Sequence, residues 1–235
     1  MTLSQEKAAL RKAAFVRRKT AHARAESSGS AATVHLLTFL RARAGPGPVA
    51  GYLPIRTEID PRPAMAALVA EGRDVCVPVV DGTGRPLRFR AWAPDCALME
   101  GAFGAMIPVD GAACTPTSLI VPLLSFDAQG GRLGYGGGFY DRTLAGLAQE
   151  RRVLAVGFAY AGQAVEAVPR EATDVCLDAV VTETGVTETG VTKTGAAETG
   201  ATETGATETG ATETGATETG ATETGATETG ASFTR

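Results

Sequence analysis

Apolar and polar positions along the first 180 residues follow the periods of strands and helices. Short apolar runs bounded by turn residues predict strands that are buried on both faces, at 49–53, 75–80, 118–124 and 153–158. Between these runs, the patterns predict helices at about 3–24, 30–44, 61–72 and 140–147. Buried strands that alternate with helices are typical of an α/β domain. We therefore expect a three-layer αβα sandwich with a central, mostly parallel sheet.

One segment departs from this pattern because it alternates apolar and basic residues. Residues 87–92 follow the tight turn Asp81-Gly82-Thr83-Gly84, which predicts an antiparallel hairpin with 75–80. One face of this hairpin should lie in water. Three aromatic residues lie in or near this segment: Phe89, Trp92 and Phe103. They could pack in the core or flank a flat heterocyclic ligand, and aromatic residues more often pack in the core.

The end of the chain is a repeat. Residues 181–230 are ten copies of a five-residue unit, mostly Ala-Thr-Glu-Thr-Gly. The unit has no large apolar residue to fill a core, and its glycine raises the entropic cost of ordering. We therefore predict a folded domain over 1–182 and a disordered low-complexity tail over 183–235.

Composition and charge exclude several classes of protein. Apolar residues make up 44% of the 235 residues, which suffices for a core. The net charge of −4 arises in the tail, so the preceding part is mildly basic, and it has no basic stripe typical of nucleic-acid binding. The four cysteines are scattered along the chain, which argues against a zinc site and against a disulfide framework. No signal segment and no run of membrane length occurs, so a soluble cytoplasmic protein is expected.

The glycine-rich segment 130–138 lies between an apolar run and a helical pattern. Glycine permits positive φ and close approach of a ligand, and amides at a helix N-terminus favour a phosphate. The spacing fits neither a P-loop nor a dinucleotide fingerprint. A flexible surface turn is the alternative. Arg132, the aromatic residues Phe139 and Tyr140 that follow the segment, and Asp141 favour ligand binding.

Charged residues elsewhere allow two interpretations each. Lys7, Arg11 and Arg18 share one stripe of the first helix, where they could grip a polyphosphate or form a solvated basic face. Glu58 follows the first strand, where open α/β sheets bind ligands, but a lone loop glutamate is usually exposed. Asp141 lies at the start of a predicted helix. It could cap the helix, or it could supply an oxygen ligand to Mg²⁺ beside bound phosphates.

The string RLGYGGGFYDR at 132–142, preceded by Phe126-Asp127, closely resembles the signature of the 5-formyltetrahydrofolate cyclo-ligase (methenyltetrahydrofolate synthetase) family, in its bacterial form. The segment 7–11 is similar to the family's KxxxLR-like helix, and YLPIRTEID at 52–60 is similar to its pterin-binding segment. Residues 168–183 resemble its VPxxxHDxxxDxVxTE ending, with Thr173 in place of the histidine. Together these matches span about 180 residues.

This resemblance implies an ATP-dependent ligase that converts 5-formyltetrahydrofolate to 5,10-methenyltetrahydrofolate in one-carbon metabolism. It implies ATP contacts from Lys7, Arg11, Arg132, Leu133, Gly134, Tyr135, Gly136, Gly137, Gly138, Phe139 and Tyr140. It implies folate contacts from Leu53, Glu58, Tyr135, Gly136, Gly137, Gly138 and Phe139. A carboxylate suits the pterin because it can accept both of its paired N–H groups.

The resemblance further implies that Arg132 and Tyr135 are catalytic and that Asp141 and Asp178 bind Mg²⁺. ATP and the folate are the expected partners of a monomer that binds neither nucleic acid nor membrane. Two alternatives stay open. One is a relative of the same fold that binds ATP or another phosphometabolite and acts on a different cofactor precursor. The other is a non-catalytic protein that binds reduced folate.

Overall fold

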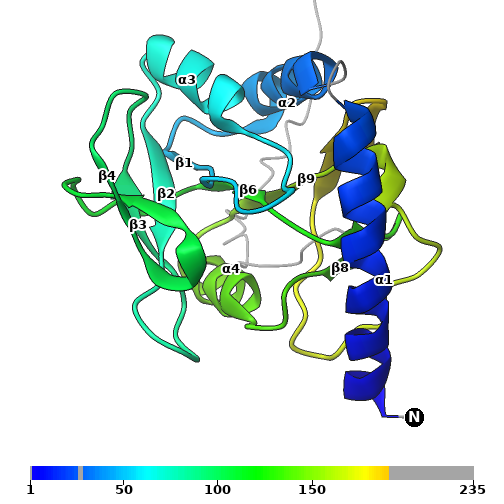
Figure 1. Ribbon diagram of the computed structural model, residues 1–235. Coiled ribbons are helices and arrows are strands. Elements are labelled where there is room, and N and C mark those ends of the chain that lie inside the picture. The colour runs from blue at the N-terminus through cyan, green and yellow to red at the C-terminus, as the bar shows by residue number, and fades with distance from the viewer. Residues whose placement is uncertain (1, 26–28, 191–235) are drawn as a thin grey trace, which may run out of the picture. The chain divides into compact units, whose positions relative to one another are not determined.

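The centre of the structure is a seven-stranded sheet in the order β11-β10-β9-β6-β1-β2-β3. The computed structural model describes residues 2–25 and 29–190 (Figure 1). The middle strands are all parallel: β1 (Val49–Ala50), β2 (Val75–Val79), β6 (Ser118–Val121), β9 (Leu154–Phe158) and β10 (Ala179–Thr182). Antiparallel strands β3 (Arg88–Ala91) and β11 (Gly185–Glu188) form the two edges. The predicted mostly parallel sheet and the hairpin of β2 with β3 are confirmed.

Helices cover both faces of this sheet, as a three-layer sandwich requires. Two of them, α2 (Gly29–Arg43) and α3 (Arg62–Ala70), lie on one face, and α4 (Phe139–Glu150) lies on the other (Figure 1). The apolar side chains of the first face form one buried cluster, which includes Leu36, Leu40, Met65, Leu68, Ile120 and Val156. On the second face, Leu144 of α4 packs with Leu119 and Val121. Within the described ranges, no helix is both long and apolar enough to cross a membrane.

The first helix, α1 (Leu3–Arg24), begins with the predicted capping box. The Gln5 amide donates to the Thr2 hydroxyl over 3.3 Å, and the Gln5 side chain accepts from the Thr2 amide over 2.9 Å. Ala14 of α1 is fully buried against Leu124 and Leu133. This packing holds one side of the helix against the segment that leads into the glycine loop.

The strand order creates a crevice beside β1. β1 pairs in parallel with β2 on one side and with β6 on the other. The connections that follow β1 and β6 therefore diverge at the carboxyl ends of the strands. Ligands bind at such switch points in open α/β sheets. Residues 51–59 and 122–138 lie at this position in the chain.

Two small antiparallel pairs were not predicted. β4 (Leu98–Glu100) pairs with β5 (Met106–Pro108), and β7 (Ser125–Phe126) pairs with β8 (Arg132–Leu133). The second pair is closed by Asp127, whose carboxylate accepts from the backbone amides of Gln129, Gly131 and Val168 over 2.8–3.0 Å. The glycine segment therefore starts from a fixed turn, so the alternative of a flexible surface turn does not describe its beginning.

The first two repeat copies continue the sheet. Strands β10 and β11 form a hairpin in which Thr182 is paired with Gly185 and Ala179 with Glu188. The predicted boundary after residue 182 falls inside this hairpin, so the folded part reaches Glu188. Composition misplaced the boundary because valine and threonine suit a strand once a neighbouring strand offers backbone partners. The disorder predicted for the later repeats concerns 191–235, which lie outside the described residues.

Candidate functional site

A pocket of about 940 Å³ lies at the carboxyl ends of the central strands. Its wall includes residues that directly follow β1, β2 and β6, which is the crevice that the strand order creates. Residues 132–142 form one side, and the stretch 171–175 approaches from the C-terminal part of the domain. The pocket brings together nearly all of the predicted site residues: Lys7, Arg11, Leu53, Glu58, Arg132, Leu133, Gly134, Tyr135, Gly136, Gly137, Gly138, Phe139, Tyr140 and Asp141.

The glycine loop has a backbone that other residues would adopt only with strain. Gly136 has φ of 99° and Gly138, at the N-terminus of α4, has φ of 63°. No side chain caps the helix at Gly138, which leaves the first amides of α4 for an anion. Arg11 fixes the outer part of the loop, since its Nε donates to the Gly134 carbonyl over 3.0 Å.

Two cations at this end of the pocket are each paired with a carboxylate. Nζ of Lys7 lies 2.6 Å from Oδ2 of Asp174 and 3.6 Å from Oε2 of Glu171. Nη2 of Arg132 lies 2.5 Å from Oδ1 of Asp141. Partial burial acts to raise the pKa of Asp174, but hydrogen bonds from Lys7 and the Glu171 amide outweigh it and leave that pKa lowered. The Asp174 carboxylate is therefore held ionised beside the glycine loop.

Asp178, which the resemblance assigns to Mg²⁺, lies outside the pocket. It is absent from the described residues that line the pocket, and its Oδ2 accepts from the Ala155 amide over 2.6 Å. Asp178 directly precedes β10, so it lies at the amino ends of the parallel strands, opposite the pocket. Asp174, four residues earlier, lines the pocket instead. The apolar run 179–182 could have indicated this position of Asp178. A residue that immediately precedes a parallel strand lies at its amino end and cannot reach its carboxyl end, where ligands bind.

The other end of the pocket is built around Glu58. Only 6% of this residue is exposed, so the alternative of a solvated loop glutamate is wrong. Its Oε2 accepts from the Ile55 amide over 2.9 Å, and its Oε1 accepts from the Tyr135 hydroxyl over 3.0 Å. Burial raises the pKa of Glu58, and the Ile55 amide, Arg18 and Tyr135 counteract part of this rise.

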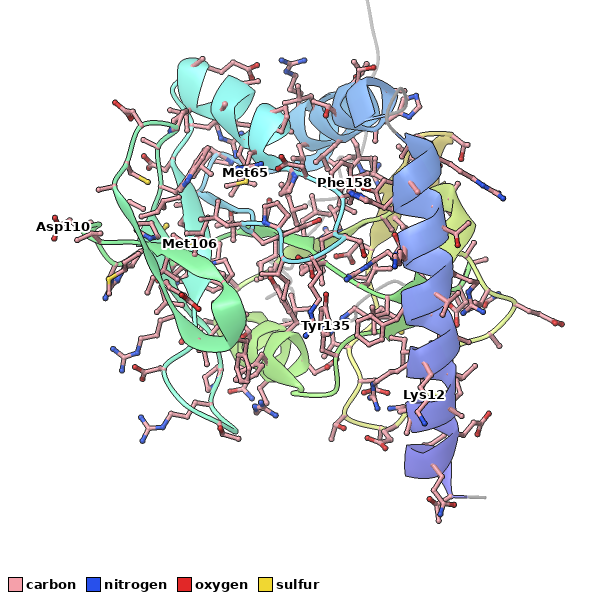
Figure 2. The ribbon with its side chains drawn as sticks, in the orientation of Figure 1. Lys12, Met65, Met106, Asp110, Tyr135 and Phe158 are labelled. Carbon is pink, nitrogen blue, oxygen red and sulfur yellow. The ribbon has the colours of Figure 1, made fainter. Side chains whose placement is uncertain are left out.

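Tyr135 joins the two ends because it belongs to the glycine loop and bonds to Glu58. Figure 2 shows it between α1 and α4. Burial raises the pKa of Tyr135 to about 12, so its hydroxyl is neutral and able to donate. Arg18 donates to the same hydroxyl over 2.7 Å. Arg18 therefore lies beside Glu58 rather than with the cations near Asp174, and sequence reasoning missed this cluster because its members are far apart in the chain.

Comparisons with known proteins show which family the sequence of this chain resembles. The model of the 5-formyltetrahydrofolate cyclo-ligase family matches residues 3–183. The chain is 34% identical to the 5-formyltetrahydrofolate cyclo-ligase of Haemophilus influenzae, over 62% of this chain and 80% of that protein. It is 38% identical to the enzyme of the same name from Escherichia coli, over 57% of this chain and 76% of that protein.

A solved structure shows the same architecture. The NMR structure of Aquifex aeolicus 5,10-methenyltetrahydrofolate synthetase superposes with a TM-score of 0.58 at 28% identity. The match covers 80% of this chain and 99% of that one. The pocket, the glycine loop and these relatives lead to one conclusion: the chain belongs to the 5-formyltetrahydrofolate cyclo-ligase family.

Proposed function

We propose that this chain converts 5-formyltetrahydrofolate to 5,10-methenyltetrahydrofolate and cleaves ATP to ADP and phosphate. The observation that carries the proposal is one pocket in which the glycine loop and its cations face the buried carboxylate of Glu58. Because every group assigned to the two substrates comes from this one chain, we propose that it acts as a monomer. We also propose a cytoplasmic location.

The reaction needs activation of a poor leaving group. An N-formyl oxygen does not depart readily, so ATP first phosphorylates it. The N10 amine then attacks the activated carbon, the ring closes and phosphate departs. The protein has to align the two reactants and neutralise the migrating phosphoryl group, which is positioning and electrostatics rather than covalent catalysis.

The chain supplies this neutralisation at the glycine loop. Lys7, Arg11 and Arg132 would contact the phosphates together with the amides at the start of α4. Asp141 and Asp174 fit a Mg²⁺ ion, which usually takes one or two carboxylates and completes its shell with phosphate oxygens and water. The bound ion would neutralise phosphate charge. Within the described ranges, no group of three or more His, Cys, Asp or Glu side chains that could hold a metal ion occurs.

The folate would lie at the Glu58 end. Leu53 and Glu58 line the pocket from the loop after β1, Tyr135 lines it from the glycine loop, and Phe139 lines it from the start of α4. The apolar walls suit the flat pterin ring, and the carboxylate suits its N–H donors. This arrangement would bring the formyl group between the two ends, within reach of the terminal phosphate.

The proposal is tested by following the absorbance of the methenyl product. Purified protein should form this product from 5-formyltetrahydrofolate only when both ATP and Mg²⁺ are present, with ADP released in equal amount. The same mixtures without ATP, or with chelator, serve as controls. ATP turnover without the folate, or with a different one-carbon substrate only, would contradict the proposal.

Paired variants test which aspartate serves the site. Asp174→Asn should lower turnover about 10- to 100-fold, because the proposed Mg²⁺ site loses one of its two carboxylates, Asp141 and Asp174. Asp178→Asn should leave turnover within about twofold and lower the free energy of unfolding by about 1 kcal/mol, since it weakens a backbone hydrogen bond. Steady-state rates and urea melts of both variants measure this. A loss of turnover confined to Asp178→Asn would reverse the assignment.

A further inference from the structure

Arg18, in the second half of α1, is a deeply buried cation with 1% exposure. Its Nε donates to the Thr57 hydroxyl over 3.1 Å, and one terminal nitrogen donates to the Tyr135 hydroxyl over 2.7 Å. The guanidinium carbon lies 5.4 Å from the centre of the Tyr135 ring and 5.8 Å from that of Phe15. Burying a charge is costly unless it is paired, so these contacts from separate segments define one position for it.

The remaining nitrogen of Arg18 faces Glu58 without bonding to it. NH1 lies 3.6 Å from Oε1 of Glu58 and has no hydrogen-bond partner among the described residues. Arg18 therefore supplies positive charge to the carboxylate but does not occupy its lone pairs. A carboxylate has about four acceptor sites. The Ile55 amide and the Tyr135 hydroxyl use one site on each oxygen, so about two stay open on a residue that lines the pocket.

We infer that Arg18 is a positioning residue for the folate substrate, holding Glu58 ionised and oriented from behind while its free acceptor sites point to the pterin. The inference rests on the proposed function, because it assumes that Glu58 binds the substrate. Arg18 is not among the described residues that line the pocket, so it acts through Glu58 and Tyr135 rather than by contact with the folate. ATP affinity should not depend on it.

Of the groups around Glu58, Arg18 is the one suited to keep its carboxylate ionised. Arg56, on the same loop as Glu58, is exposed, and its charge is screened by water. Burial raises the pKa of Tyr52, Tyr135 and Tyr140, so all three tyrosines are neutral near pH 7. The charge of Glu58 also raises the pKa of Tyr52 and Tyr140, and Tyr135 bonds to Glu58. Among these groups, Arg18 alone is both buried and positively charged. Its removal should raise the pKa of Glu58 further and shift folate binding to higher pH.

The test is Arg18→Met, which keeps an unbranched side chain and removes the charge. Calorimetric titrations with 5-formyltetrahydrofolate should give a raised Kd. The increase should approach about tenfold where the pH lies below the pKa of Glu58 in both proteins, the factor for about one pKa unit when only the ionised carboxylate binds. The deficit should shrink as the pH rises toward 9, since Glu58 then ionises without help. The Kd for ATP should stay within about twofold, and Arg18→Lys should recover part of the folate affinity.

Arg17→Met is the matched control, because Arg17 is the adjacent residue and donates instead to the Ser125 hydroxyl over 3.1 Å. It should bind folate as the wild type does. If Arg18→Met does not fold, as judged by its thermal melt, Arg18→Gln provides the same neutral test with polar atoms for Thr57 and Tyr135. A folate deficit equal at every pH, or an equal loss of ATP affinity, would overturn the inference.

Glu58→Gln, measured in parallel, separates this inference from the proposed function. If Glu58→Gln binds folate normally, the assignment of Glu58 to the substrate fails. If Glu58→Gln weakens binding but the Arg18 variants bind like the wild type at every pH, only the role of Arg18 fails.

Discussion

Replacing Asp141 with asparagine should lower the turnover number about 100- to 1,000-fold, the usual effect of removing one group that stabilises transition-state charge. Asp141 begins α4 beside the glycine loop and pairs with Arg132 over 2.5 Å. Asparagine keeps the shape and can still accept from the Val175 amide, which bonds to Asp141 over 3.1 Å. It lacks the charge that a Mg²⁺ site requires, so the loss should appear in turnover while the fold persists.

The measurement is the rate of methenyl product formation at saturating ATP and folate, over a range of Mg²⁺ concentrations. Added Mg²⁺ should restore part of the lost rate if the aspartate binds the ion. Asp110→Asn is the control, because this exposed carboxylate lies on the side of the domain opposite α1 (Figure 2). Near-normal turnover of Asp141→Asn with an unchanged Mg²⁺ requirement would remove Asp141 from the metal site.

Replacing Glu58 with glutamine should weaken folate binding about 30- to 150-fold, corresponding to about 2–3 kcal/mol for charge-assisted hydrogen bonds to a buried group. The amide can accept through only one atom, and its NH₂ group would face the N–H donors of the pterin. ATP affinity should change less than about twofold, since Glu58 lies at the other end of the pocket from the cations paired with Asp174 and Asp141.

The pH dependence gives this prediction a second readout. Burial raises the pKa of Glu58 above its ordinary value, so the wild type should lose folate affinity on acidification at a higher pH than an exposed glutamate would dictate. Affinity is full where Glu58 is ionised and falls as it takes up a proton. Glu58→Gln should show no such step. Titrations from pH 5 to 8 check this, and an identical step in both proteins would assign it to another group.

The order of elements and the glycine loop could be predicted because both depend on local pattern. Apolar runs placed four of the five parallel strands, all except β10, and the position of Glu58 after β1 placed it at the binding edge of the sheet. The capping box of Thr2 and Gln5 gave the start of α1 correctly. Such features need only a few neighbouring residues and the general rule for ligand sites in open sheets.

What could not be predicted depends on long-range contacts. Arg18, Glu58 and Tyr135 form one cluster from three distant segments, so the pattern on α1 could not distinguish a phosphate ligand from a partner of Glu58. The family motif assigned Asp178 to the metal, whereas the direction of β10 places Asp178 at the amino ends of the parallel strands. The edge strand β11 depends on backbone partners in β10, which composition does not reveal.

The three basic residues of α1 have a consequence for insertions and deletions. Lys7 reaches Asp174, Arg11 reaches the carbonyl of Gly134, and Arg18 reaches Tyr135, so one rigid helix sets a separation of about 16 Å between the first and last of them. One extra residue between Arg11 and Arg18 would rotate the later part of α1 by about 100°. Length changes within this stretch should therefore be tolerated far less than single substitutions on its outer side.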